Sequence, residues 1–343
     1  MSRIKIVFAI LFLTLLSLTL AAQADVKRES VTKMDFKGTL GTIMRIFGAD
    51  KPMRTVEYYK GNVFRSDNID DKGRMISSQI IDLDKELFIT LDHKDKKFTQ
   101  MTFEEFRQMM ARTLEQMKSD REKAQREHAE VEWDFKVNVT KPGETEVIVG
   151  QPAEKVIINI LVTSKTTQPA KQEGAAQTAQ GDLIVSSSNW MVKSIDGQKE
   201  IENFYLKFAE KLGMMPDKGG LEQMMRQLNQ SYPQLADAMK KLQEESKKLS
   251  GVPVRTHTVY ETRTQATPSS GTEPEKKSAE IPTSVGGLLK GISKKVAKSE
   301  KSESSANVLL EISDELVSAE VVSIEASQFE IPANYKLQPN AMK

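Results

Sequence analysis

Hydrophobic and polar positions alternate in short runs from Arg28 to Met101, and this pattern predicts strands joined by tight turns. Val56–Tyr59 and Val63–Arg65 flank the turn Lys60–Asn62, in which Gly61 and Asn62 tolerate a positive φ. Further pairs of alternating runs follow along the chain at similar spacing. We therefore expect a meander of antiparallel hairpins over Arg28–Met101, rather than a series of parallel βαβ units.

The pattern changes to helical spacing at Thr102. Thr102 and Glu105 form a capping box, which is a typical start of a helix. Apolar residues then recur every three or four positions, at Phe103, Phe106, Met109, Met110, Leu114 and Met117. We expect this helix to end near His128. Three more helices are predicted over Gln198–Leu212, Leu221–Leu228 and Pro233–Leu249.

Alternation with a period of two returns after the first helix. It predicts strands over Val131–Val139, Thr145–Val149, Lys155–Val162, Leu183–Ile195, Val252–Thr262, Val308–Ile312 and Leu316–Phe329. Thr163–Gly181, rich in Gln, Ala and Thr, is expected to be a long flexible loop. Thr264–Ala306 is a low-complexity segment of Ser, Lys, Glu and Pro, and we expect it to be disordered. Strands on both sides of it predict one domain with an insertion.

The first 24 residues have the pattern of a secretory signal peptide. Arg3 and Lys5 precede the apolar run Ile6–Leu20, and Ala22–Ala24 matches an A-x-A cleavage site. The run is shorter than the ~20 residues of a membrane-spanning helix, so we favour cleavage before Asp25 over an uncleaved anchor. We therefore expect export to the periplasm, with secretion or peripheral attachment to the envelope as alternatives. No transmembrane segment is expected after cleavage.

Composition excludes several kinds of chemistry. The chain of 343 residues has no Cys, which excludes disulfides, thiol catalysis and thiolate metal sites. Its 49 basic and 48 acidic residues leave no net basic excess for binding nucleic acid. His93, His128 and His257 are not at metal-ligand spacing, and His93 is expected to be a solvated turn residue. Without a nucleophile elbow or a P-loop, we expect no enzyme activity, metal or cofactor.

Methionine is the one unusual feature of the composition, with 16 residues. Those that concentrate on the helices are the pairs Met109–Met110, Met214–Met215 and Met224–Met225, with Met117 and Met239. Ordinary core filling, a plastic hydrophobic groove and a thioether copper(I) site are the three interpretations, and no His–Met cluster supports the last. The residues expected to line a groove are Phe103, Phe106, Met109, Met110, Phe204, Phe208, Met224 and Met225. Val285–Val296 has the spacing of a small cationic amphipathic helix. It is either a membrane or partner contact or a transiently helical piece of linker.

Four segments resemble a family of exported bacterial proteins of unknown function whose fold is similar to that of the lipoprotein carriers LolA and LolB. They are Tyr58–Asp67, Ile80–Asp92, Lys97–Met101 and the terminal Phe329–Lys336, in which Asn334 stands where Gly is usual. The resemblance implies an incomplete antiparallel β-barrel wrapped around helices, with a hydrophobic cavity between them.

We therefore expect an α+β protein with a curved antiparallel β-sheet, an incomplete LolA-like barrel, wrapped around helices. Its expected parts are the signal peptide (1–24), the sheet and helices (25–263), the disordered insertion (264–306) and C-terminal strands that complete the same domain (307–343). The expected function is non-enzymatic binding of a lipid, an acyl chain or a lipoprotein in a hydrophobic groove. The alternative is a structural or interaction protein of the cell envelope, with an envelope protein as partner, whose helices plug the sheet.

Overall fold

The computed structural model describes residues 24–37, 51–126, 130–168, 177–214, 233–247, 249–265 and 307–339. Six strands come first: β1 (Asp25–Phe36), β2 (Met53–Lys60), β3 (Val63–Ile69), β4 (Met75–Asp82), β5 (Leu87–Asp92) and β6 (Lys97–Thr102). The later strands are β7 (Glu130–Thr140), β8 (Thr145–Ile148), β9 (Gln151–Gln168), β10 (Gln177–Val192), β11 (Val252–Gln265), β12 (Asn307–Val322) and β13 (Lys336–Leu337). The described helices are α3 (Phe103–Arg126), α4 (Gln198–Lys211), α6 (Pro233–Ser246) and the short 3-10 helix η2 (Ala326–Phe329).

All these strands belong to one large, open, mostly antiparallel sheet of 13 strands. Strands β1 to β6 pair in sequence order, which confirms the predicted meander. Strand β12 pairs with β1 on one side and with β11 on the other, so it joins the early and late strands. The order then continues through β10 and β9 to β7, and the short β13 lies parallel to β6 at the opposite edge.

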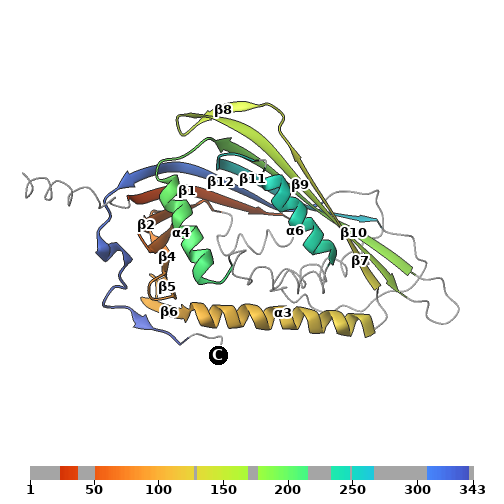
Figure 1. Ribbon diagram of the computed structural model, residues 1–343, viewed down its shortest axis with the longest axis horizontal. Helices are drawn as coiled ribbons and strands as arrows, with labels where there is room; N and C mark the ends of the chain where they lie inside the picture. Colours follow the sequence, from red (N-terminus) through yellow and green to blue (C-terminus); the bar gives the residue numbers. More distant parts are fainter. Residues whose placement is uncertain are drawn as a thin grey trace, which may run out of the picture.

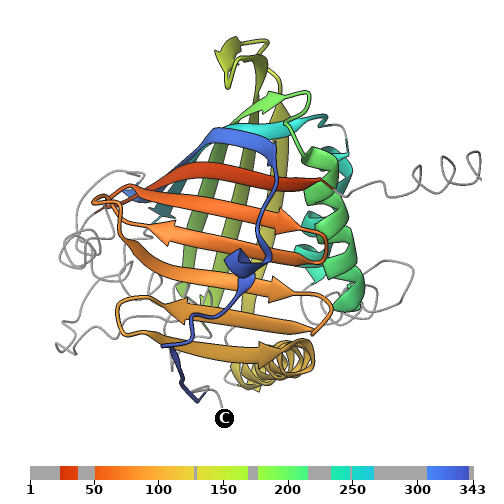
Figure 2. The ribbon, with the colours of Figure 1, turned by 90° about the vertical axis from the view of Figure 1, so that its left-hand side faces the viewer.

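The sheet is strongly bent. Figure 2 shows β1 to β6 as a front wall, β12 and β11 at the top, and β7, β9 and β10 as a wall behind. Helix α3 starts at β6 and runs beneath the arch toward the lower ends of β7 and β10 (Figure 1). Helix α4 packs against β1 and β2, and α6 contacts β7. We name the face of the sheet that carries α4 the inner face.

An aromatic core, which we name the plug cluster, fixes α4 and the start of α3 to the inner face. Its buried members are Val26, Tyr59, Phe64, Leu83, Phe103, Phe204 and Leu212. On α4, Ile201, Phe204 and Phe208 recur at helical spacing and face this cluster, which is why this segment is an amphipathic helix. Rings meet in tilted or edge-on pairs, such as Tyr59–Phe64 at 4.9 Å between centroids.

The C-terminal residues 323–338, which we name the strap, cross the outer face of the front wall (Figure 2). Ile331 and Tyr335 pack there against a buried cluster of Ile80, Ile89 and Leu91. The strap ends in β13, and the N–H of Gln338 donates to the carbonyl oxygen of Phe98 at 2.8 Å.

Several local expectations are confirmed, and two are wrong. The capping box is present, because the Glu105 N–H donates to Thr102 Oγ1 at 3.1 Å and the Thr102 N–H to Glu105 Oε2 at 2.8 Å. Thr163–Gly181 is not one long loop: β9 continues to Gln168 and β10 starts at Gln177, since Thr suits a strand although this composition resembles a linker. Residues 307–322 form one strand rather than two, because β1 and β11 pair with it from both sides. The predicted strand up to Phe329 ends at Val322, and Ala326–Phe329 forms the 3-10 helix η2 instead.

Some expectations lie outside the described residues. These are the signal peptide up to residue 23, the helix Leu221–Leu228, the amphipathic Val285–Val296 and the insertion from residue 266 to 306. The first two residues of the predicted insertion, Thr264 and Gln265, belong to β11.

Candidate functional site

A row of apolar side chains crosses the inner face from β1 to β7. Residues that are directly paired in antiparallel strands lie on the same face of a sheet, so the register identifies the row. Its members, in strand order, are Phe36, Leu310, Tyr260, Val185, Ile160 and Val137. Val137 is buried and the other five are half-buried, so this apolar row is only partly covered.

The alternation along β1 places this row on the inner face. Val26 belongs to the plug cluster, and Phe36 lies ten positions further along the same strand, which pairs with β2 without a register shift. Even-numbered residues of β1 therefore share one face. Neighbours of the row along the strands are on the outer face, where charged side chains such as Glu311 and Lys136 alternate with half-buried apolar ones such as Ile184.

The inner face becomes more polar toward the plug cluster. One step along the strands from the apolar row lies a mixed row of Met34, Ile312, Thr258, Ser187, Ile158 and Val139. The next step is a polar row of Thr32, Asp314, Thr256 and Asn189. Thr32 donates to Asp314 at 2.6 Å there. The inner face thus offers an apolar strip beside a strip of hydrogen-bonding groups.

The predicted groove residues are placed differently from the apolar row. The structure brings Phe103, Phe106, Phe204 and Phe208 together in and around the plug cluster, where Phe103 is 0% and Phe204 is 1% exposed. The ring centroids of Phe103 and Phe208 are 5.7 Å apart, which is ordinary core packing. Met109 and Met110 are half-buried on α3, and Met224 and Met225 lie outside the described residues.

Sequence reasoning missed the apolar row. The alternation of apolar and polar residues in each strand indicates which residues share a face. It does not show which strands are neighbours in the sheet. Strand β12 in particular is inserted between β1 and β11 from the far end of the chain.

Polar groups lie at the border of the plug cluster on the inner face. Arg28 Nη1 donates to Glu57 Oε2 at 3.0 Å, and the Tyr59 hydroxyl donates to the same oxygen at 3.2 Å. The hydroxyl of Tyr205 on α4 lies 3.3 Å from that of Tyr59. Burial raises the pKa of both tyrosines, so both hydroxyls stay protonated as hydrogen-bonding groups.

A second polar group of residues lies on the outer face under the strap. Asp67 Oδ1 accepts from Arg65 Nε at 2.6 Å and from Ser78 Oγ at 2.5 Å. Ser78 Oγ lies 2.6 Å from Nε2 of His93, whose Nδ1 lies 2.6 Å from the Tyr335 hydroxyl. His93 is thus half-buried and bonded on both nitrogens, and the expectation of a solvated turn residue was wrong. The strap, 242 positions away along the chain, covers the turn in which His93 lies.

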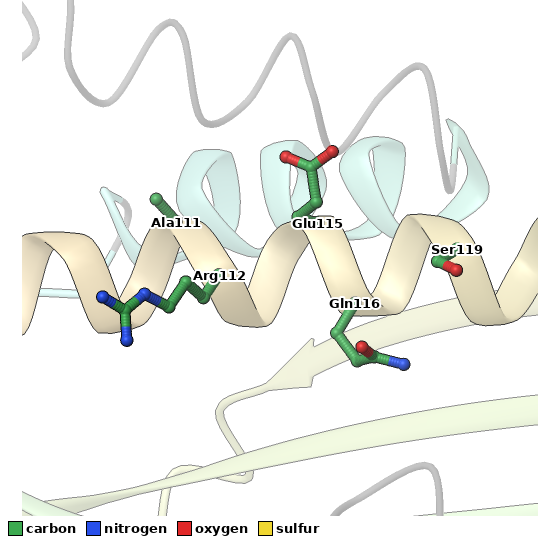
Figure 3. A pocket seen from close by; sticks show the side chains of 5 residues that line it. All are labelled: Ala111, Arg112, Glu115, Gln116 and Ser119. Carbon is green, nitrogen blue, oxygen red and sulfur yellow. The ribbon is translucent and has the colours of Figure 1, made fainter. Parts of the chain in front are cut away.

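Other features of the described ranges offer no convergent chemistry. A hollow along α3 is lined by Ala111, Arg112, Glu115, Gln116 and Ser119, and their side chains diverge from one helix (Figure 3). No group of three or more acidic or histidine side chains in these ranges could hold a metal ion. No helix in the described part of the chain is long and apolar enough to cross a membrane.

The chain matches no protein-family model, and neither a curated protein nor a solved structure is significantly similar to it. We therefore infer a function from the positions of the side chains on the inner face of the sheet. An extended, partly covered apolar strip beside hydrogen-bonding groups can hold an elongated apolar molecule without changing it chemically.

Proposed function

We propose that the protein is a non-enzymatic binding protein for an elongated apolar ligand, such as a lipid acyl chain, which lies along the apolar row. The single observation that carries this proposal is the continuous row of Phe36, Leu310, Tyr260, Val185, Ile160 and Val137 on the inner face. Five interstrand spacings make such a row roughly 24 Å long, which suits an extended chain rather than a compact molecule.

Energetics support this size of ligand. Each methylene group that leaves water contributes about 0.8 kcal/mol, and association costs on the order of 4–15 kcal/mol in lost freedom. A chain of more than about ten methylenes is therefore needed for useful affinity. Short apolar metabolites would gain too little from the same surface.

The proposed setting is the bacterial envelope. The signal-peptide pattern of the first 24 residues supports export. The resemblance to LolA-like proteins supports an apolar cargo, which includes the acyl chains of lipoproteins. Neither requires a reaction, and we propose no catalytic residue.

Native mass spectrometry of the protein purified from its own envelope tests the proposal. We expect a fraction of the molecules to carry one additional mass in the range of a lipid, which disappears after extraction with organic solvent. A single ligand-free mass, together with no lipid in the solvent extract, would contradict the proposed function.

The second candidate is a structural or interaction protein of the envelope whose helices plug the sheet. The packing of Phe204 and Phe103 favours it, because at this end α4 and α3 already fill the inner face. Met110→Ala and Phe106→Ala measure how closely the start of α3 packs, and both residues lie outside the apolar row. Binding of a fluorescent fatty acid by the unmutated protein distinguishes the candidates: no binding, together with strong destabilisation by both changes, would favour the structural role.

A further inference from the structure

The strap is held on the outer face by two kinds of contact. Apolar packing of Ile331 and Tyr335 onto the cluster of Ile80, Ile89 and Leu91 supplies one. The other is polar: the backbone of β13 pairs with β6, Arg65 Nη1 donates to the carbonyl oxygen of Gln328 at 2.7 Å, and the Tyr335 hydroxyl bonds to His93. The two side-chain anchors belong to the same buried network, in which Arg65 is 7% exposed while Asp67 and Ser78 are fully buried.

With His93 neutral, one arrangement of protons satisfies the contacts among Ser78, His93 and Tyr335, while Asp67 Oδ2 is buried without a hydrogen-bond partner in the described part of the chain. The single hydroxyl proton of Ser78 goes to Asp67, because a carboxylate can only accept and the two oxygens are 2.5 Å apart. Ser78 Oγ must then accept from the Nε2–H of His93, which leaves Nδ1 as an acceptor. The Tyr335 hydroxyl fills that position by donating to Nδ1 at 2.6 Å.

Protonation of His93 conflicts with this arrangement in two ways. The new Nδ1–H would point at the hydroxyl proton of Tyr335, so this proton would have to rotate away and the hydroxyl oxygen would have to accept instead of donating. The network, balanced by the opposite charges of Arg65 and Asp67, would also gain an uncompensated positive charge.

The charged groups around His93 are consistent with a neutral ring. Burial and then Arg65 on β3 lower the pKa of His93, while Asp67 on β3 and Asp92 beside the turn oppose this and do not outweigh it. Tyr335 is the titratable group that faces the ring from the strap.

We propose that His93 and Tyr335 form an acid-released latch, which holds the strap on the outer face at neutral pH and frees it when His93 is protonated. The imidazole lies in the turn after β5, so it can swing out to water without moving a strand. Release of the strap would uncover Ile80, Ile89 and Leu91 as an apolar patch. The latch does not depend on the proposed binding function.

Hydrogen–deuterium exchange of the full-length protein at about pH 7.5 and about pH 5.5 tests the latch, with rates corrected for intrinsic exchange. A free imidazole at the usual histidine pKa of 6.5 gains most of a proton in this window. The opening equilibrium of residues 331–338 should therefore rise by up to about tenfold at the lower pH. His93→Gln should remove this pH response, whereas His257→Gln, a change of an exposed histidine on β11, should leave it intact.

Tyr335→Phe provides a second test should His93→Gln fail to fold. It keeps the ring and removes the hydroxyl, so the strap should exchange at neutral pH about as fast as the wild-type strap does in acid. Equal corrected exchange of the wild-type strap at both pH values would overturn the proposal. The proposal would also be overturned if the pH response remained in His93→Gln. The same holds if the strap of Tyr335→Phe exchanged at neutral pH as slowly as the wild-type strap.

Discussion

At the scale of single residues, two glycines differ in why the position needs glycine. Gly251 has a φ of +99°, and a Cβ there would lie 2.1 Å from the carbonyl oxygen of Val192. Gly213, after α4, has a φ of +72° with no atom within 4 Å of where its Cβ would be. Both positions favour glycine for conformational reasons, but only Gly251 is also required by contact with neighbouring backbone.

Substitution of these glycines by alanine separates the two effects. We expect Gly213→Ala to cost about 1–2 kcal/mol, the usual penalty of a left-handed alanine. Gly251→Ala should cost at least about 3 kcal/mol, because the backbone at Val192 must also move. Urea unfolding of the two variants and the wild type measures this, and equal losses would contradict the packing described for Gly251.

Single residues also mark the limit of local sequence reasoning. The hydroxyl and carboxylate at Thr102 and Glu105 are three positions apart, so the capping box could be predicted and is confirmed. The polar residues around His93 indicated that its side chain is exposed to solvent. No residue near it along the chain reveals that Tyr335 lies against the ring. The partners of a residue are predictable only when they are close along the chain.

At the scale of elements, α4 is held by a single apolar face. Phe204 is 1% exposed within the plug cluster, while Leu206, two positions along the same helix, is 56% exposed. The apolar spacing that predicted the helix also indicated that Phe204 faces the core, but it placed Tyr205 on the same face, and Tyr205 is 45% exposed. It did not show whether these residues line a groove or fill a core, because spacing carries no information on how closely facing elements approach.

Truncation of these two side chains tests the role of α4. Phe204→Ala should cost about 3–5 kcal/mol, since it leaves a cavity among aromatic rings that relax only in part. Leu206→Ala should change stability by less than about 0.5 kcal/mol. Chemical denaturation measures both, and a cost below about 1 kcal/mol for Phe204→Ala would mean that the plug cluster is not a closely packed core.

At the scale of the whole molecule, the return of β12 determines the shape. Hydrophobic alternation predicted that a strand follows the long insertion, but not that it lies between β1 and β11. Thr262 of β11 is paired with Asn307 of β12, so the two ends of the insertion lie on adjacent strands. The connection therefore needs only the reach of a hairpin loop.

Replacement of residues 266–306 by a short Gly/Ser loop follows from this geometry. The low-complexity composition of this segment and the adjacent strand ends both predict that the fold is kept. We expect the free energy of unfolding to stay the same or to rise by up to about 2 kcal/mol, since each halving of a loop saves only about 0.6 kcal/mol of closure entropy. A loss of more than about 2 kcal/mol in thermal and chemical unfolding would show that the segment contributes to the core.

The central claim is that the inner face binds an apolar chain along the row from Phe36 to Val137. Neighbouring residues of β10 provide the most direct measurement, because Val185 lies on the inner face and Ile184 on the outer face, both half-buried. Binding of a fluorescent long-chain fatty acid is titrated for the wild type, Val185→Asn and Ile184→Asn, after each variant is shown to be folded. We predict saturable binding by the wild type, at least about a tenfold loss of affinity in Val185→Asn, the equivalent of 1.4 kcal/mol, and little change in Ile184→Asn. Equal affinity of the two variants, or no binding by the wild type, would contradict the account.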